Sequence, residues 1–465
     1  MNPPTADFFP SLPPHALMCR FESDMPACTA YPAANRFVEA IGADDVARAL
    51  ALRGSRSIVG GVAPLALRVN IPFCERAGEP CSCRPVVTRR HVCAARYLRA
   101  LQQEAALATG ELGSARTVSR IHVGGVIPLF LSDGELAQVT GLLRAHFNVA
   151  DDAVLSIEAA ASRCTRGRLA ALAAAGFNRL FVGIDDLRSA GADGAPLQDA
   201  LQAAGQLGFT QVTVEIPCAA PGPDAPAFAR AVTNVAALRP ARVRIERRHG
   251  RRPRPGAAMA RALPLLESSI EHTALLRDAF ERLLSAGYVH VGLDEFALPE
   301  DPLAIASRHG RLHPGVRGLS TRPEGDVLAL GVCAIGRIGA VAFQNVDLLS
   351  DYYASLQAGR LPVARGLVLD RGDLARESVI KGLLCQGRVA FEAISLSHLI
   401  DMRALFAQEF VLLDPLIQAG LVEVDGEALE LTDMGRWFAP VVAAVFDREL
   451  QRDALRVRLS RGDAP

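Results

Sequence analysis

Short apolar segments alternate with longer amphipathic segments through most of the chain. The short segments are rich in Val, Ile and Leu, which is typical of buried β-strands. The longer ones repeat apolar residues at helical spacing. The predicted strands are Leu65–Ile71, Arg120–Gly124, Ala153–Glu158, Arg179–Ile184, Gln211–Ile216, Arg242–Glu246 and Val289–Leu293. The predicted helices are Val92–Thr109, Ser132–Phe147, Arg166–Ala175, Leu197–Leu207, Pro226–Leu238 and Leu265–Ala286.

Signals for helix ends support this alternation. Ser132 and Glu135 have the spacing of a capping box, which predicts that a helix begins there. Gly176, Gly208 and Gly287 each follow a predicted helix, where a left-handed residue would end it. Repeated strand–helix units indicate a parallel sheet with right-handed crossovers. The predicted fold class is therefore α/β, a full or partial TIM-like (β/α) barrel whose functional loops follow the carboxyl ends of the strands.

The two ends of the chain differ from the middle. Residues 1–57 form a Pro-rich arm with a short helical piece near Val38–Leu52, and residues 58–350 form the predicted barrel. Residues 351–465 are predicted to form a mostly helical domain that includes a small hairpin around Asp425 and Gly426. Its predicted helices are Asp351–Gln357, Ala375–Cys385, Ile394–Leu412 and Met434–Leu455, and its predicted strands are Leu421–Val424 and Leu429–Leu431.

Composition narrows the function only slightly. The 465 residues are 50% hydrophobic and carry no formal net charge, so charge gives no general reason to expect nucleic acid or a membrane surface as a partner. No apolar run reaches the length of a membrane span. The ten cysteines are scattered along a long chain, which favours free thiols in a reducing cytoplasm over a disulfide framework.

Three of these cysteines follow the first predicted strand. Cys74, Cys81 and Cys83 lie on a loop rich in Gly, Pro and charged residues. Thiols that leave a strand end on one loop are placed as metal ligands are, close together and able to converge. The alternative is three free thiols in a folded loop.

The segment that contains this loop, LRVNIPFC, resembles the YVHIPFC segment of oxygen-independent coproporphyrinogen III oxidases, a radical-SAM family. HVGGVIP (His122–Pro128) is similar to the HWGGGTP of that family, and GRLHPGVRGLST to its GRLHRNFQGYTT. The resemblance extends from Tyr31 to about Leu450. It implies a partial barrel of radical-SAM type and a mostly helical C-terminal domain.

The resemblance also implies two cofactors, a [4Fe-4S] cluster and S-adenosylmethionine. In the family, the first three cysteines of a CxxxCxxCxC pattern bind the cluster, and the remaining iron binds S-adenosylmethionine. Cys74 matches the first cysteine, and Cys81 and Cys83 match the third and fourth, whereas Gly78 replaces the second. Cuboidal clusters are held by thiolates, and glycine offers no ligand atom. The implied ligand set is therefore incomplete unless Cys83 is recruited.

The residues implied to contact S-adenosylmethionine are partly kept. Gly124 and Gly125 match two of the three family glycines, and Glu158 matches a carboxylate that contacts the cofactor. Asp185 stands at a family glutamine and Glu215 at a family aspartate. The substitutions gather at the cofactor positions while the framework stays recognisable, which favours a retained fold without the standard chemistry.

A basic loop follows the sixth predicted strand. Arg247, Arg248, Arg251 and Arg252 lie in the sequence ERRHGRRPRPG. Arginine binds carboxylates and phosphates with a planar fork of donors, so this loop could hold a polyanion. A tetracarboxylate such as coproporphyrinogen fits, and so does a nucleic acid, although no aromatic residues are interleaved for base stacking. The alternative is a solvated loop.

Three hypotheses follow. The first is a haem-biosynthesis family member that is non-catalytic or impaired and binds a porphyrin, a porphyrinogen or a partner. The second is an active radical-SAM enzyme with an atypical cluster on Cys74, Cys81 and Cys83. The third is a polyanion or nucleic-acid binding module that uses the loop from Arg247 to Arg254.

Overall fold

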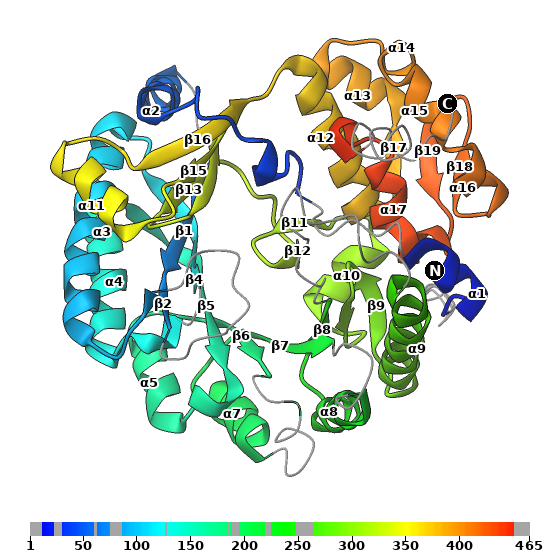
Figure 1. The fold of residues 1–465 in the computed structure, drawn as a ribbon, viewed down its shortest axis with the longest axis horizontal. Coiled ribbons are helices and arrows are strands. Elements are labelled where there is room, and N and C mark those ends of the chain that lie inside the picture. The colour runs from blue at the N-terminus through cyan, green and yellow to red at the C-terminus, as the bar shows by residue number, and fades with distance from the viewer. Residues whose placement is uncertain are drawn as a thin grey trace.

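The structure is a computed structural model that describes residues 12–22, 30–59, 63–74, 86–125, 128–184, 187, 195–218, 225–247 and 264–450. One twelve-stranded sheet, curved into an open barrel, organises the chain (Figure 1). Its strand order is β16-β15-β14-β13-β1-β4-β5-β6-β7-β8-β10-β9. The bounds are β1 (Leu65–Ile71), β4 (Thr117–Gly125), β5 (Asn148–Ala160), β6 (Arg179–Gly183), β7 (Gln211–Cys218), β8 (Arg242–Arg247), β9 (Val289–Gly292), β10 (Glu295–Ala297), β13 (Val327–Leu330), β14 (Ile335–Ile338), β15 (Val341–Asn345) and β16 (Val363–Val368).

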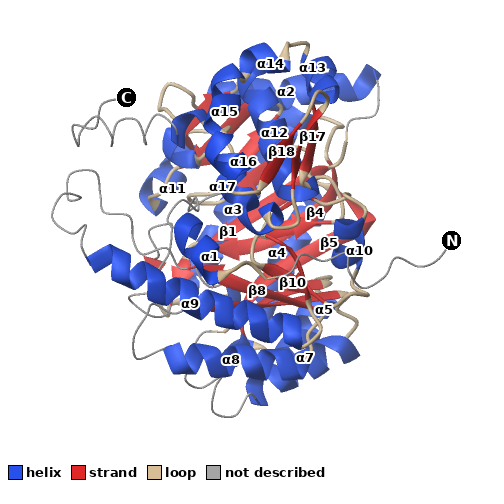
Figure 2. Cartoon of the chain, turned by 90° about the vertical axis from the view of Figure 1, so that its right-hand side faces the viewer, coloured by secondary structure: helices blue, strands red, loops and turns tan. Residues whose placement is uncertain are grey.

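The neighbouring strands β1, β4, β5, β6, β7 and β8 of this sheet pair in parallel, as predicted. The connecting helices lie on the outer side of the curved sheet, and α8 and α9 run next to each other (Figures 1 and 2). These helices are α3 (His91–Leu112), α4 (Asp133–His146), α5 (Arg166–Ala174), α7 (Ala195–Gln206), α8 (Ala225–Leu238) and α9 (Pro264–Ser285). The predicted capping box is present, since Ser132 accepts from the Glu135 amide and Glu135 accepts in return. The alternation of strands and helices is confirmed.

The two faces of the parallel strands differ in polarity. Outward-facing residues such as Val69, Val123 and Ile157 are fully or almost fully buried under the helices. The alternate positions, such as Arg68 and His122, face the interior and are polar. Parallel strands that are buried on both faces read as continuous apolar runs. The interior of this barrel is therefore not a packed hydrophobic core.

The sheet departs from the prediction at β9. Leu293 and Asp294 both have left-handed backbones, with φ of 51° and 57°. They form a tight turn into β10, which pairs antiparallel with both β9 and β8. The seventh predicted strand is therefore separated from β8 by a short strand that periodicity could not detect.

The sheet also continues on the other side of β1. β13 pairs with β1 in parallel, and β14, β15 and β16 add antiparallel strands. β16 thus extends the barrel sheet beyond residue 350, where the alternation was expected to stop. α11 (Leu349–Gln357) lies between β15 and β16 in the sequence.

The C-terminal region combines helices with a small sheet. The predicted hairpin is present as β18 (Val422–Val424) and β19 (Ala428–Leu431), and β17 (Arg388–Ala390) adds a third strand. The prediction of one helix over Ile394–Leu412 is wrong, because Leu399 is left-handed with φ of 52° and Asp401 caps a new helix. The helices are α12 (Arg371–Gln386), α13 (Phe391–His398), α14 (Met402–Leu405), α15 (Ala407–Leu412), α16 (Asp414–Gln418) and α17 (Ala439–Ala444). The predicted helix over Met434–Leu455 is interrupted in its described part, because the 3-10 helix η5 (Gly435–Phe438) precedes α17 and α17 ends at Ala444. The part of this prediction from residue 451 onward lies outside the described range.

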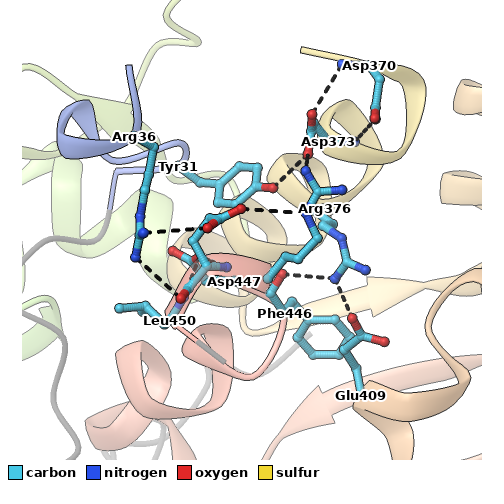
Figure 3. A network of polar contacts seen from close by, with 11 residues as sticks. Tyr31, Arg36, Asp370, Asp373, Arg376, Glu409, Phe446, Asp447 and Leu450 are labelled. Atoms are coloured by element: carbon cyan, nitrogen blue, oxygen red, sulfur yellow. Dashed lines mark hydrogen bonds and ion pairs between the residues drawn. The ribbon is translucent and has the colours of Figure 1, made fainter. Parts of the chain in front are cut away.

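The N-terminal arm joins the barrel to this region. It contains α1 (His15–Glu22) and α2 (Ala43–Val59). Between them, the Tyr31 hydroxyl donates to Asp373 at 3.0 Å, and Arg36 contacts Glu449 at 3.5 Å (Figure 3). Arg376 binds the Phe446 carbonyl beside these contacts. The arm is therefore held against α12 and the segment after α17.

A buried carboxyl group lies where α3 meets the extended sheet. Glu104 is 1% exposed and accepts from Tyr352, Asn345 and the Gly331 amide at 2.6 to 2.7 Å. Burial raises the pKa of Glu104 to about 7, although these hydrogen bonds oppose the shift. The folded protein therefore holds a proton at Glu104 at pH values where the unfolded chain has released it.

This proton makes stability depend on pH. Between pH ~4.5 and ~7 the folded state binds more protons than the unfolded state, so the free energy of unfolding falls as pH rises, by up to roughly 3 kcal/mol for this one group. Replacing Glu104 with Gln should flatten this slope in urea unfolding across that window. Glu111, which is exposed at the end of the same helix, provides the control Glu111→Gln. Equal slopes in the wild type and Glu104→Gln would contradict the assignment.

Candidate active-site cavity

A cavity of about 1480 Å³ lies between the barrel interior, the N-terminal arm and α12. Tyr31 and Phe37 line it from the arm, and Glu377 and Lys381 line it from α12. The barrel contributes several cations to this central cavity: Arg68, Arg244, Arg247, Arg317 and Arg337. All five are paired with carboxylates, for example Arg68 with Glu324 at 3.3 Å and Arg244 with Glu215 at 3.4 Å.

Arg317 is the centre of the charge network inside the barrel. It lies in the turn of the hairpin formed by β11 (His313–Gly315) and β12 (Gly318–Ser320), which lies inside the curve of the sheet (Figure 1). Its guanidinium donates to Glu215 at 2.8 and 3.0 Å and contacts Glu158 at 3.1 Å. A third carboxylate, Glu246, lies 3.8 Å away. These three carboxylates raise the pKa of Arg317 above its ordinary value, against the effect of burial.

Glu158 has a second partner on the neighbouring strand. His122 Nε2 lies 2.9 Å from Glu158, while His122 Nδ1 lies 2.9 Å from Ser156. Burial raises the pKa of Glu158, but the hydrogen bond with His122 and the charge of Arg317 outweigh it, so the pKa lies below the usual range. Glu158 is therefore an ionised carboxylate whose neighbours already compensate its charge.

A buried carboxyl group fixes the hairpin that carries Arg317. Glu295 in β10 is 5% exposed and accepts from the Leu319 amide at 2.9 Å. Burial raises the pKa of Glu295 to about 7, although Arg244 opposes this shift. Gly318 has φ of 103° beside this carboxyl, and a Cβ there would overlap it. The hairpin position thus depends on a glycine and on one buried hydrogen bond.

The two predicted cofactor-binding glycines lie at the carboxyl end of β4. Gly125 has φ of 129°, and a Cβ there would overlap the Ile71 carbonyl on β1. A Cβ at Gly124 would lie 2.7 Å from both Glu158 Oε1 and His122 Nε2. The structure therefore brings Gly124, Glu158 and, through Arg317, Glu215 together. Asp185 lies outside the described residues.

The cysteine loop is fixed at its two ends. Cys74 is fully buried in β2 (Phe73–Cys74), which pairs with β3 (Val86–Val87). Cys81 and Cys83 lie outside the described residues, so the structure does not test the predicted metal site. Within the described part of the chain, no group of three His, Cys, Asp or Glu side chains could hold a metal ion.

Only the first residue of the predicted basic loop is described. Arg247 binds Asp294, with Nη2 2.8 Å from Oδ1. Burial raises the pKa of Asp294, but the charge of Arg247 and its hydrogen bond lower it below the usual value. Arg247 is thus already engaged by a carboxylate. Arg248, Arg251 and Arg252 lie outside the described residues.

The sequence contained an unused signal for the ion pairs. Arg317 lies in the segment GRLHPGVRGLST and His122 begins the segment HVGGVIP, both of which carry the family resemblance. Both residues belong to the polar interior. In the sequence, polar residues at every second position of the parallel strands indicate this interior, as in Ser156–Ile157–Glu158. That alternation identifies the inward-facing residues. It does not reveal that a distant hairpin brings Arg317 to them.

Comparison with known proteins agrees with this architecture. Residues 369–438 match the HemN C-terminal domain family. The chain is 32% identical to the oxygen-independent coproporphyrinogen III oxidase of Pseudomonas aeruginosa over 93% of this chain and 95% of the relative. It is also 32% identical to the Escherichia coli enzyme of that name over 96% of this chain and 97% of the relative. This chain belongs to the oxygen-independent coproporphyrinogen III oxidase family.

The fold of this oxidase family is also confirmed in three dimensions. The structure of Escherichia coli coproporphyrinogen III oxidase (HemN), described as a radical SAM enzyme, superimposes with a TM-score of 0.79 at 30% identity. The match covers 91% of this chain and 97% of that one. S-adenosylmethionine and a [4Fe-4S] cluster are thus the cofactors implied by the family. None of the helices described is long and apolar enough to cross a membrane.

Replacing Arg317 with a residue that lacks a guanidinium tests whether its ion pairs with Glu158 and Glu215 stabilise the fold. Arg317→Gln would leave Glu158 and Glu215 without their shared cation, at a cost of roughly 3 kcal/mol in the free energy of unfolding at pH 7. The loss should be smaller at pH 5, because carboxylates that lack a cation take up protons more readily. Urea unfolding at both pH values measures this.

Arg311 gives the matched control, since it is exposed just before the same hairpin. Arg311→Gln should change stability by less than about 0.5 kcal/mol. An equally small effect of Arg317→Gln would show that the bridge contributes no net stability.

Proposed function

We propose that this protein is a haem-biosynthesis member of the coproporphyrinogen oxidase family that binds a porphyrinogen-class tetracarboxylate without the family's radical chemistry. The observation that carries this proposal is the bridge from Arg317 to Glu158 and Glu215. By family resemblance these carboxylates belong to the S-adenosylmethionine site. In this chain a side chain of the protein supplies their positive charge.

The chemistry of the bridge explains why it opposes the cofactor. S-adenosylmethionine carries positive charge on its sulfonium and ammonium groups, so carboxylates would face it favourably. A ligand that used Glu158 or Glu215 would have to displace a guanidinium that donates two hydrogen bonds to Glu215. Displacement would break these ion pairs and leave the guanidinium without them in a partly buried place, which is costly.

The thiol ligands give independent support. Gly78 stands where the family pattern has its second cysteine. The remaining Cys81 and Cys83 are separated by a single residue, so Cys83 could replace the missing ligand only on a rearranged loop. The donor set of this chain does not fit the family cluster, and we derive no reaction step from it.

The volume and the charged lining of the central cavity support the proposed binding of a porphyrinogen-class tetracarboxylate. Its volume of about 1480 Å³ exceeds the roughly 300–1,000 Å³ typical of small-molecule sites. Cations reach it from different elements, including Arg68 on β1 and Lys381 on α12. A flat or puckered macrocycle with carboxylates at its periphery matches cations that are spread around a wide cavity.

Anaerobic reconstitution with iron and sulfide, followed by electron paramagnetic resonance of the reduced protein, tests the loss of chemistry. The wild type should give no cubane signal that shifts on addition of S-adenosylmethionine. Gly78→Cys should restore cluster uptake, and Gly78→Cys combined with Arg317→Gln should restore the shift. Gly78→Ser is the matched control, because it adds a side chain of similar size without a thiolate.

A signal in the wild-type protein that shifts with S-adenosylmethionine would overturn the proposed loss. The second hypothesis, an active enzyme with an atypical cluster, would then hold. Cys83→Ser should abolish the signal in that case.

Ligand binding is measured separately with coproporphyrin III, the stable oxidised form of the porphyrinogen. Its fluorescence should change on binding to the wild type, and the affinity should fall at least tenfold for its tetramethyl ester, which lacks ionised carboxylates. Lys381→Gln should weaken binding of the free acid, whereas Arg311→Gln should not. Equal affinity for acid and ester would refute recognition of the carboxylates.

A further inference from the structure

A second, smaller cavity of about 320 Å³ lies at the opposite, amino end of the barrel strands. We call it the basal chamber. The hairpin that carries Arg317 forms one wall, and the first residues of the parallel strands form the others. Its lining includes five arginines, namely Arg120, Arg179, Arg242, Arg317 and Arg322. Asp152 is the one carboxylate among the described residues that line it.

Two of these cations have carboxylates of their own outside or at the rim of the chamber. Arg242 binds Asp301 with Nη2 2.8 Å from Oδ1, and both residues are buried. Arg322 pairs with Asp152 at 3.0 Å, and both side chains are more than half exposed. Together with Arg317, which is held by its own carboxylates, these arginines add little net charge. Of the five arginines that line the chamber, this leaves Arg120 and Arg179 as the two that are not paired with a carboxylate among the described residues.

Arg179 is the arginine of the basal chamber whose charge is least satisfied. Its Nε is buried without a hydrogen-bond acceptor among the described residues, and no ion pair joins it to a described carboxylate. Its guanidinium carbon lies 4.6 Å from the centroid of the Phe181 ring, which holds the planar group in place by a cation–π contact. Burial, and then the nearby Arg242, lower the pKa of Arg179 to about 10, so it remains protonated at neutral pH.

Among the carboxyl groups near Arg179, Glu295 has the largest electrostatic effect on the pKa of Arg179, but Glu295 already has a hydrogen-bond donor of its own. Glu295 accepts from the Leu319 amide, and burial raises its pKa to about 7, so part of the population is neutral at physiological pH. Arg120 Nη2 donates to the carbonyls of Arg322 and Pro323, which are neutral. Burial lowers the pKa of Arg120, and the nearby Glu324, which is paired with Arg68, opposes this shift.

A hydroxyl group without a partner lies in the same part of the barrel. Thr213 is 3% exposed, its Oγ1 has no hydrogen-bond partner in the described chain, and its backbone is level with Arg242 and Phe181 in the sheet register. Buried polar atoms without partners are uncommon in folded proteins and call for an explanation. Thr213 is not among the residues that line the chamber, but Arg179 is, and a bound anion would explain both its unsatisfied Nε and the surplus charge.

We propose that the basal chamber is a binding site for a small dianionic oxyanion, held chiefly by Arg179 and Arg120. Two fixed positive charges match two negative ones, and guanidinium groups bind oxyanions through paired N–H donors. The chamber has room for about ten water molecules, which suits a phosphate, a sulfate or a short dicarboxylate but not a macrocycle. The exposed rim at Asp152 and Arg322 provides the entrance.

Isothermal titration of the full-length protein at constant ionic strength tests this proposal without any variant. Phosphate, sulfate, malonate and glycerol 3-phosphate are compared with sodium chloride as background. At least one dianion should bind at one site with a dissociation constant at or below the millimolar range, and at ten times that constant it should raise the Tm by about 1–2 °C. Preference for glycerol 3-phosphate over phosphate would identify the occupant as the terminal phosphate of a metabolite, and preference for malonate a carboxylate.

Variants then locate the site. Arg179→Gln should weaken binding at least tenfold, and Arg120→Gln, the second variant should the first not fold, should weaken it severalfold. Arg311→Gln is the matched control, because Arg311 is an exposed arginine next to the same hairpin and lines neither cavity. Binding no stronger than that of chloride, or equal binding by Arg179→Gln and the wild type, would overturn the proposal.

Discussion

Compensation of buried charge inside the barrel is the constraint on which this structure depends. Parallel strands place Glu158 and Glu215 on the inner face, away from bulk water, where an isolated carboxylate would be costly. The chain meets that cost with Arg317, supplied by a hairpin that returns into the barrel. The hairpin is fixed in turn by Glu295 and by the left-handed backbone of Gly318. A local turn and a buried carboxyl group thus determine the electrostatics of the whole interior.

The same hairpin divides the interior into two compartments of different character. Arg317 lines both the central cavity and the basal chamber. In the central cavity, cations and carboxylates mostly alternate, so a polyanionic ligand would bind by exchanging one set of ion pairs for another. In the basal chamber, the carboxylates that act on Arg120 and Arg179 are shared, since Glu324 pairs with Arg68 and Asp301 with Arg242. Charge surplus is therefore localised at the end of the barrel away from the loops where radical-SAM resemblance places chemistry.

The sequence predicted the elements whose signals are local. The strand Leu65–Ile71 has its predicted bounds, and the predicted Ser132 capping box is present. What it could not supply were pairings between distant segments, such as β13 beside β1, because a four-residue apolar stretch has no partner encoded in its own pattern. The Arg317 bridge could not be predicted for the same reason, since it joins Glu158 and Glu215 to a residue more than a hundred positions away from either. The left-handed residue Leu399, which splits a predicted helix, carries no glycine signal.

The retained glycines show how a framework can preserve a motif for reasons other than catalysis. Gly125 is demanded by β1, whose carbonyl at Ile71 leaves no room for a Cβ, and Gly124 by the His122 and Glu158 side chains above it. Both would be kept by packing alone, whether or not a cofactor ever approached them. The informative positions are therefore others: Gly78, which stands where the family pattern has a cysteine, and Arg317, which supplies a positive charge to Glu158 and Glu215. These two positions are the grounds on which we propose that this chain keeps the family fold without the family's radical reaction.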